Sequence, residues 1–196
     1  MVSPLLAIRL IPQAAPDLTG VAALAFTSAN GVAALAALTP ERTRPVFTVG
    51  DATAEAARAA GFTLVQSAGG DLDRLAALLI AQGPGVGPLL VPGALEPAGD
   101  LPALLRGRVE AVALAVYEAV ETKAETPDAF DAILIHSARA SRVLAGFGPF
   151  VGQTAVALSS AVAAALGDRS GLEIRLARTP DETALLAALG NPVRRG

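Results

Sequence analysis

Hydroxyl side chains occur at four places where an apolar run ends and an alanine-rich stretch begins. Because the first turn of a helix has unpaired backbone N–H groups, such junctions suit a carboxylate or phosphate ligand. The alternative for each is simple N-capping, worth about 0.5–2 kcal/mol. The junctions are Thr27-Ser28-Ala29-Asn30, Asp51-Ala52-Thr53, His136-Ser137-Ala138-Arg139 and Ser159-Ser160. The candidate binding residues are Thr27, Ser28, Asn30, Thr53, Ser137, Arg139, Ser159 and Ser160.

Two charged residues at these junctions affect the interpretation. Arg139 falls in the first turn of a predicted helix, where a cation opposes the helix dipole. Its placement is understandable if it meets an external carboxylate, and an arginine reaching into solvent is the alternative. Asp51 would repel an anion, so we expect it to cap its own helix instead.

Only three other features bear on catalysis. Tyr117 is the sole tyrosine, and its phenol could donate a proton or hydrogen bond to a leaving oxygen, although an interfacial aromatic is the alternative. His136, the sole histidine, ends a predicted strand and is interpreted as a polar strand end. The chain has no cysteine, which excludes thiolate metal sites, and we expect neither metal nor cofactor.

Strands and helices alternate along most of the chain, which favours an α/β protein with parallel sheets covered on both faces. Strands are predicted at Leu5–Ile11, Ala22–Thr27, Val46–Val49, Thr63–Val65, Leu89–Val91, Val109–Tyr117, Ala132–His136, Thr154–Ala157 and Glu173–Leu176. Helices are predicted at Ala29–Leu38, Ala52–Ala60, Leu72–Ala81, Ala98–Leu105, Arg139–Ala145, Ser160–Gly167 and Asp181–Leu189.

Parts of this strand and helix pattern occur twice in the sequence. Residues 23–32 resemble residues 132–141, residues 49–54 resemble 156–161, and residues 71–79 resemble 181–189. Three blocks repeated in one order indicate two related lobes, and we expect a ligand between them.

The repeat also suggests how the chain is divided. We expect a connector strand in residues 1–16, a complete α/β lobe in 17–112, a second connector strand in 113–126, and a second α/β lobe in 127–196. The counterpart of Leu89–Tyr117 would begin before Met1, so we expect the second lobe to be incomplete, without its N-terminal strand and helix. The alternative is that the lobes were never equal.

Composition narrows the class of partner. The net charge is −3 and aromatic residues are 4% of the chain, which argues against a nucleic-acid surface. The sequence has neither a membrane-spanning apolar run nor a signal-peptide pattern. We expect a cytoplasmic, monomeric protein that binds a small molecule, with no nucleic-acid or membrane partner.

The ordered blocks resemble the uroporphyrinogen-III synthase family. The matching pieces are Phe26-Thr27-Ser28-Ala29-Asn30-Gly31-Val32, Val49-Gly50-Asp51-Ala52-Thr53-Ala54, Ala60-Gly61-Phe62, Val116-Tyr117-Glu118, Ile135-His136-Ser137, Ser159-Ser160-Ala161 and Thr179-Pro180. The resemblance implies a HemD-like fold, in which two flavodoxin-like lobes with parallel sheets are joined by a two-stranded connector. The family's opening strand, Arg-Pro turn and helix are absent here, and Ala157-Leu158 stands where the family usually has Gly-Pro.

The resemblance also implies an activity. Members of the family cyclise hydroxymethylbilane, a linear polycarboxylate tetrapyrrole, with inversion of ring D and loss of water, and use no cofactor or metal. Tyr117 matches the family's tyrosine best placed to assist departure of the hydroxyl, and the eight candidate residues above would bind the substrate. The alternatives are a non-catalytic small-molecule binding or regulatory module, and an inactive N-terminally truncated synthase.

Overall fold

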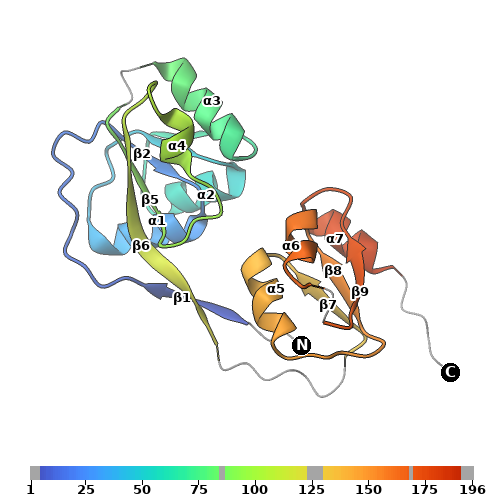
Figure 1. The fold of residues 1–196 in the computed structure, drawn as a ribbon. Helices are drawn as coiled ribbons and strands as arrows, with labels where there is room; N and C mark the ends of the chain where they lie inside the picture. The colour runs from blue at the N-terminus through green and yellow to red at the C-terminus, as the bar shows by residue number, and fades with distance from the viewer. Residues whose placement is uncertain (1–4, 84–86, 123–129, 168–169, 191–196) are drawn as a thin grey trace. The chain divides into compact units, whose positions relative to one another are not determined.

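The structure is a computed structural model that describes residues 5–83, 87–122, 130–167 and 170–190 (Figure 1). Its contacts divide the chain into two compact units. We call Ile8–Val120 the central unit, and we call Met1–Ala7 together with Glu121–Gly196 the terminal unit.

A six-stranded sheet forms the centre of the central unit, in the order β1-β6-β5-β2-β3-β4. The strands are β1 (Leu6–Leu10), β2 (Ala23–Phe26), β3 (Val46–Thr48), β4 (Val65–Ser67), β5 (Leu89–Ala94) and β6 (Ala111–Glu121). Strands β2 to β6 run parallel to one another. Counted from β2 along the chain, their order is 3-2-1-4-5, so the strand order reverses between β5 and β2.

Strand β1 runs antiparallel to β6, so the sheet is mixed. The N–H of Ile11 donates to the Val116 carbonyl at 3.1 Å, and the N–H of Thr122 donates to the Leu5 carbonyl at 3.0 Å. The parallel arrangement predicted for the lobes holds for β2 to β6, and β1 adds an antiparallel edge to the sheet. The chain leaves β1 through a loop, not through the crossover helix that parallel neighbours require.

Helices cover both faces of the sheet in the central unit. Helices α1 (Ala29–Leu38) and α2 (Asp51–Ala59) lie on one face, and α3 (Leu72–Gln82) and α4 (Leu101–Leu105) lie on the other. Strand β2 shows why both faces need cover. Leu24 and Phe26 pack toward α1 and α2, Ala23 and Ala25 pack toward α3 and α4, and all four are buried.

Local sequence accounts for most helix starts. Ser28, Asp71 and Asp100 cap α1, α3 and α4, each accepting a hydrogen bond from the backbone N–H three residues on. Helix α2 is different, because its N-cap is Gly50 and no side chain caps it. The expectation that Asp51 caps its own helix was wrong, since Asp51 is already the first helical residue.

The terminal unit contains a three-stranded parallel sheet in the order β7-β8-β9. Its elements are β7 (Ala132–Ile135), α5 (Ala138–Ala145), β8 (Thr154–Ala157), α6 (Ser160–Ala164), β9 (Glu173–Leu176) and α7 (Glu182–Leu189). Leu144 of α5 and Val162 of α6 pack on one face of the sheet, against Ile135 and Ala155. Helix α7 contacts β8 and β9 and buries Leu185 completely.

Several boundaries differ from those expected. Strand β4 begins at Val65 and helix α4 at Leu101, two and three residues later than predicted. Helix α4 begins late because Asp100 is its N-cap and Pro102 lies in its first turn. Strand β6 extends to Glu121, and its pairing with β5 continues as far as Tyr117.

Candidate functional site

Tyr117 and Ser28 form the most distinctive polar contact of the central unit. The two hydroxyl oxygens are 2.9 Å apart, and either can be the donor. Tyr117 is 8% exposed and packs with Ala34 of α1. The Ser28 oxygen also accepts the Gly31 N–H at 3.2 Å. Because one O–H is used between the pair, the other O–H remains to donate to a third group.

A bulge in the β5–β6 ladder turns Tyr117 toward Ser28. Pro92 pairs with Leu114 and Gly93 with Ala115, but Ala94 pairs with Tyr117, because the register shifts at that point. Paired residues share a face of the sheet, so the shift places Tyr117 on the face of Leu114. In an unbroken strand, side chains three residues apart would lie on opposite faces. The bulge therefore determines that the phenol meets α1.

Close packing of α1 on β5 holds the other half of the pair. A Cβ atom at Gly31 would lie 2.6 Å from the Pro92 carbonyl oxygen. Only glycine allows the first turn of α1 to come this near to the β5 backbone. Since the N–H of Gly31 also donates to Ser28, this approach sets the distance between the Ser28 hydroxyl and the Tyr117 strand.

The pair lies where ligands bind in open α/β sheets. Ser28 follows β2, and Tyr117 is paired with the last residue of β5. Strands β2 and β5 are the neighbours at which the strand order reverses, and their carboxyl ends border the usual ligand crevice. Both hydroxyls are thus at the expected binding end of this sheet.

The other candidates of the central unit differ in exposure. Thr27 is half-buried between β2 and α1, and Asn30 is exposed in the first turn of α1. Thr53 is 7% exposed in the first turn of α2, so its side chain is mostly enclosed by protein. One end of the sheet therefore brings together four candidates, Thr27, Ser28, Asn30 and Tyr117. Thr53 lies at the start of the next helix.

The terminal unit repeats the arrangement of capped helix starts. Ser137 caps α5 and accepts the Ala140 N–H at 3.1 Å, and Ser159 caps α6 and accepts the Val162 N–H at 3.4 Å. Arg139 is half-buried in the first turn of α5, and Ser160 is the exposed first residue of α6. These four candidates lie at the carboxyl ends of β7 and β8.

Two acidic residues also lie at this end of the terminal unit. His136 Nε2 lies 2.7 Å from a carboxylate oxygen of Glu182, the first residue of α7. Asp181 caps α7 by accepting the Ala184 N–H at 2.8 Å. A hydrogen bond from the Thr179 hydroxyl, followed by that N–H, lowers the pKa of Asp181 below its ordinary value. The sequence did not single out Glu182, because its partner lies 46 residues away.

Sequence reasoning also missed Gly31 as a residue that shapes the site. Gly31 does not have a positive φ, so no turn signal marks it. Gly31 was a possible clue, because a glycine in the first turn of an otherwise alanine-rich helix lowers helix propensity and needs a packing reason.

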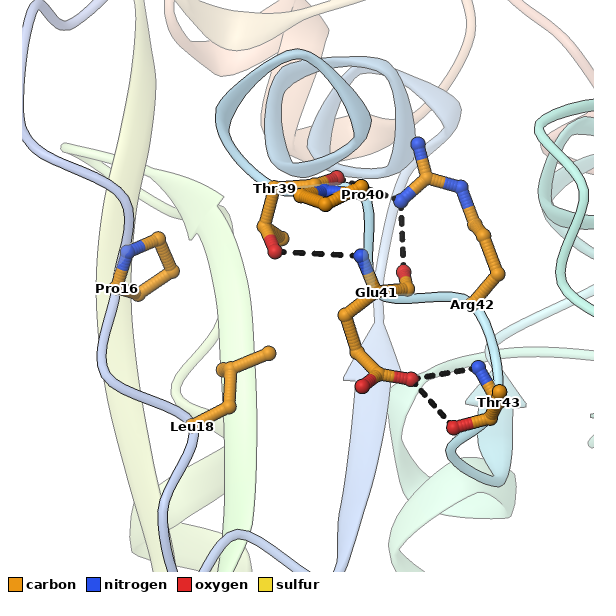
Figure 2. Close-up of a pocket in the computed structure, with 7 residues that line it drawn as sticks. All are labelled: Pro16, Leu18, Thr39, Pro40, Glu41, Arg42 and Thr43. Carbon is orange, nitrogen blue, oxygen red and sulfur yellow. Dashed lines mark hydrogen bonds between the residues drawn. The ribbon is translucent and has the colours of Figure 1, made fainter.

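A shallow hollow of about 450 Å³ lies at the opposite end of the strands (Figure 2). Its polar groups are used within the protein. The Glu41 carboxylate accepts from both the N–H and the hydroxyl of Thr43, and these bonds lower the pKa of Glu41. Arg42 donates to the carbonyls of Thr39 and Glu41. We assign no ligand to this hollow.

The described residues contain neither a metal-binding cluster nor a membrane-spanning helix. No group of three or more histidine, aspartate or glutamate side chains there is arranged to hold a metal ion. No helix in the described part of the chain has the length and apolarity needed to span a bilayer.

Known structures with the same fold come from uroporphyrinogen-III synthases. A uroporphyrinogen-III synthetase from Helicobacter pylori 26695 superposes with a TM-score of 0.71 at 19% identity, covering 93% of this chain and 88% of that one. A mutant uroporphyrinogen III synthase from the extremely thermophilic bacterium Thermus thermophilus superposes with a TM-score of 0.55 at 17% identity, covering 96% of this chain and 87% of that one. At these identities the likeness establishes the fold alone. No curated protein matches the sequence.

A family model described as "Uroporphyrinogen-III synthase HemD" matches residues 1–187, nearly the whole chain. The resemblance carried by the sequence blocks is thereby confirmed. The chain belongs to the uroporphyrinogen-III synthase HemD family.

Proposed function

We propose that this chain is a cytoplasmic uroporphyrinogen-III synthase, which cyclises hydroxymethylbilane with inversion of ring D and loss of water in tetrapyrrole (haem) biosynthesis. Family membership supports the reaction class. The observation that carries the proposal is the buried phenol of Tyr117 beside Ser28 at the binding end of the sheet. In this proposal the two units are the two flavodoxin-like lobes, and β1 with β6 is their connector.

Tyr117 is the proton donor in this proposal. If Ser28 donates to the phenolic oxygen, the phenol keeps its own proton for the substrate. That proton leaves with the substrate hydroxyl as water, and the pyrrole becomes an azafulvene. The later loss of a proton, when ring closure restores aromaticity, returns the phenol to its neutral form. General acid catalysis of this kind contributes about 10²–10⁴-fold in rate.

The helix starts act as carboxylate-binding groups. Backbone N–H groups at the beginning of a helix bind anions without adding charge to the protein. This suits a chain whose net charge is −3 and whose substrate carries several carboxylates. Ser28, Asn30 and Thr27 would bind from the central unit, with Thr53 at the next helix, and Ser137, Arg139, Ser159 and Ser160 would bind from the terminal unit.

The substrate supplies most of the reactivity. A hydroxymethylpyrrole loses its hydroxyl readily, so the protein need only assist that loss and hold the chain of pyrroles in the conformation that closes with inversion. This division of labour requires no cofactor, and the residues at the site are hydroxyl, amide and guanidinium groups that bind and orient.

The test is the product isomer. Freshly prepared hydroxymethylbilane closes without enzyme to the non-inverted isomer I. We expect the full chain to form isomer III, measured by chromatography of the oxidised porphyrins. Tyr117→Phe keeps the ring and removes the hydroxyl, and we expect it to lower turnover about 10²-fold or more.

The fluorescence of Tyr117 allows substrate binding to be measured separately from turnover. Because Tyr117 is the only tyrosine and there is no tryptophan, the intrinsic fluorescence excited above the phenylalanine band comes from Tyr117 alone. Formation of isomer I only, with substrate still altering that fluorescence, would show a binding module and overturn the synthase proposal. Unchanged turnover in Tyr117→Phe would remove Tyr117 from the chemistry.

A further inference from the structure

Asn30 and Gly31 form the single Asn-Gly pair of the sequence, in the first turn of α1. An asparagine before a glycine is open to deamidation, because the next backbone nitrogen can attack the side-chain amide and glycine has no side chain to hinder the approach. The other asparagine, Asn191, precedes a proline, which has no backbone N–H and cannot react in this way. The sequence therefore has one asparagine suited to this reaction.

The reaction has two steps and needs only water as a co-reactant. The Gly31 nitrogen bonds to the side-chain amide carbon of Asn30, the bond from that carbon to Nδ2 breaks, and the Gly31 proton leaves with Nδ2 as ammonia. The product is a five-membered succinimide ring. Water then opens the ring at either carbonyl, which gives aspartate or isoaspartate. Nothing is oxidised or reduced.

The first turn of α1 restrains the attacking nitrogen. The Gly31 N–H donates to the Ser28 hydroxyl at 3.2 Å, so its proton is engaged. Asn30 and Gly31 both lie within the helix. A helical ψ keeps the next backbone nitrogen away from the side chain, and ring closure requires a different ψ at Asn30. The reaction is therefore blocked while the first turn is intact.

The packing of α1 on β5 adds a second restraint. Gly31 is buried, and a Cβ atom there would lie 2.6 Å from the Pro92 carbonyl oxygen, so its backbone is pressed against β5. The peptide group between Asn30 and Gly31 cannot turn without moving the helix away from this strand. Asn30 itself is exposed, so water reaches its side chain. The protection of Asn30 thus lies in the backbone of Gly31.

We propose that Asn30 is a deamidation site controlled by the hydrogen bond between Gly31 and Ser28. In the intact fold Asn30 stays an amide. Local opening of the first turn of α1 releases the Gly31 nitrogen, and Asn30 is then converted to aspartate or isoaspartate. This inference does not depend on the proposed synthase activity.

The modification changes the chemistry of the candidate site. Asn30 lies with Ser28 at the start of α1, where backbone N–H groups suit an anionic ligand. A carboxylate on residue 30 repels such a ligand. The aspartate product is compatible with the helix, because its dipole favours a negative charge in the first turn. The isoaspartate product lengthens the backbone and disrupts that turn. Either product therefore binds an anion less well.

Mass and charge measure the conversion in the full chain. Exchange of the amide NH₂ for OH raises the mass slightly, and the new carboxylate adds a negative charge to a chain of net charge −3, so isoelectric focusing separates the product. Peptide mapping assigns the change to Asn30. In warm, mildly alkaline buffer we expect the folded chain to convert more slowly than the chain in guanidinium chloride by about tenfold or more.

Variants of Ser28 test the control by its hydroxyl. Ser28→Ala removes the acceptor, and we expect the folded chain to convert about fivefold faster, the factor that corresponds to an N-cap worth about 1 kcal/mol. Ser28→Thr keeps the hydroxyl and should convert as slowly as the unaltered chain. Asp71→Ala removes the cap of α3 in the same unit and should leave the rate unchanged. In guanidinium chloride all three variants should convert equally fast.

Asn30→Asp tests the consequence for binding. The helix dipole favours this variant, so we expect it to remain as stable as the unaltered chain in denaturant unfolding. For the proposed activity we expect a KM for hydroxymethylbilane that is several-fold higher, and Tyr117 fluorescence should show weaker binding even in a chain without turnover. Unchanged binding would overturn the predicted effect on the site.

Three results would overturn the deamidation site itself. The first is conversion at the same rate in the folded and the denatured chain. The second is equal conversion in Ser28→Ala and Ser28→Thr. The third is an unchanged rate of mass increase in Asn30→Gln, whose longer side chain must close a six-membered ring and reacts more slowly. None of these measurements involves turnover, so failure of the synthase proposal would leave them unaffected.

Discussion

The hydroxyls of Ser28 and Tyr117 lie 2.9 Å apart although 89 residues separate them in the chain. Ser28 comes from the loop between β2 and α1, and Tyr117 comes from β6, two strands away in the sheet. Ser28 therefore has two tasks. It caps α1 through the Gly31 N–H, and it fixes the direction of the phenol.

Ser28→Ala tests both tasks, because it removes the hydroxyl that caps α1 and contacts the phenol. Loss of the cap should reduce the free energy of unfolding by about 1 kcal/mol. Loss of the partner lets the phenol rotate, so we expect the rate of isomer III formation to fall about tenfold or more. Ser28→Thr keeps the hydroxyl and should restore both. Denaturant unfolding and the turnover assay measure the two effects.

The near-ultraviolet circular dichroism of the sole tyrosine provides a second readout for this variant. We expect the tyrosine band to weaken in Ser28→Ala and to remain in Ser28→Thr, because the band depends on a fixed ring. Ser67→Ala also removes a hydroxyl that accepts a backbone N–H, that of Gly69, and it should leave the band unchanged. An unaltered band in Ser28→Ala would show that Ser28 does not orient Tyr117.

Gly31→Ala tests the close packing of α1 on β5. Alanine favours helix by about 1 kcal/mol over glycine, but here its Cβ would lie 2.6 Å from the Pro92 carbonyl oxygen. That oxygen is backbone and cannot move aside, so the helix must shift. We expect a net loss of about 1–3 kcal/mol in unfolding free energy and a loss of turnover.

Gly93→Ala is the matched control for this prediction. A Cβ atom at Gly93 meets nothing within 4 Å, and Gly93 does not have a positive φ. Its stability should stay within about 0.5 kcal/mol of the unaltered chain, as for surface substitutions. Equal stability of the Gly31 and Gly93 variants would refute the close-packing argument.

Arg42→Lys tests the hydrogen bonds by which one guanidinium joins the C-terminal ends of α1 and α2. The guanidinium donates to the carbonyls of Ala36 and Thr39 at the end of α1, to that of Glu41, and to that of Ala60 at the end of α2. Lysine has one compact ammonium and cannot serve both helices. We expect unfolding free energy to fall by about 2 kcal/mol in denaturant titration.

Arg58→Lys is the control for the loss of stability expected in Arg42→Lys. The exposed Arg58 side chain donates to one carbonyl, that of Val65. Its replacement should change the unfolding free energy by less than about 0.5 kcal/mol. If both lysine variants lose the same stability, the several bonds of Arg42 carry no special weight.

Asp181 gives the terminal unit a dependence on acid. Hydrogen bonds from Thr179 and the Ala184 N–H lower its pKa below the ordinary value of 3.8. A depressed pKa means that the folded state favours the charged form, so the stabilisation is complete above pH 3.8 and is lost as the pH falls through the folded-state pKa. We expect Asp181→Asn to reduce the acid dependence of unfolding below pH 3.8, measured by circular dichroism. An identical acid profile would contradict this role.

The sequence was sufficient for the elements and most of their ends. Alternation of apolar runs and alanine-rich stretches predicted the nine strands and seven helices that the structure has in its described residues. Boundaries moved where a cap competed with the apolar pattern, as at Asp100 before α4. The direction of β1 was not readable, because an apolar strand does not record whether its neighbour runs parallel or antiparallel.

The candidate site depends partly on local sequence and partly on tertiary structure. The sequence by itself determined that Ser28, Ser137 and Ser159 cap helices, because a cap is a contact over three residues and needs nothing from elsewhere in the chain. Only the tertiary structure decided that Tyr117 faces Ser28. That depends on the bulge between β5 and β6, which exists only once the two strands pair and which moves the phenol to the face where α1 lies.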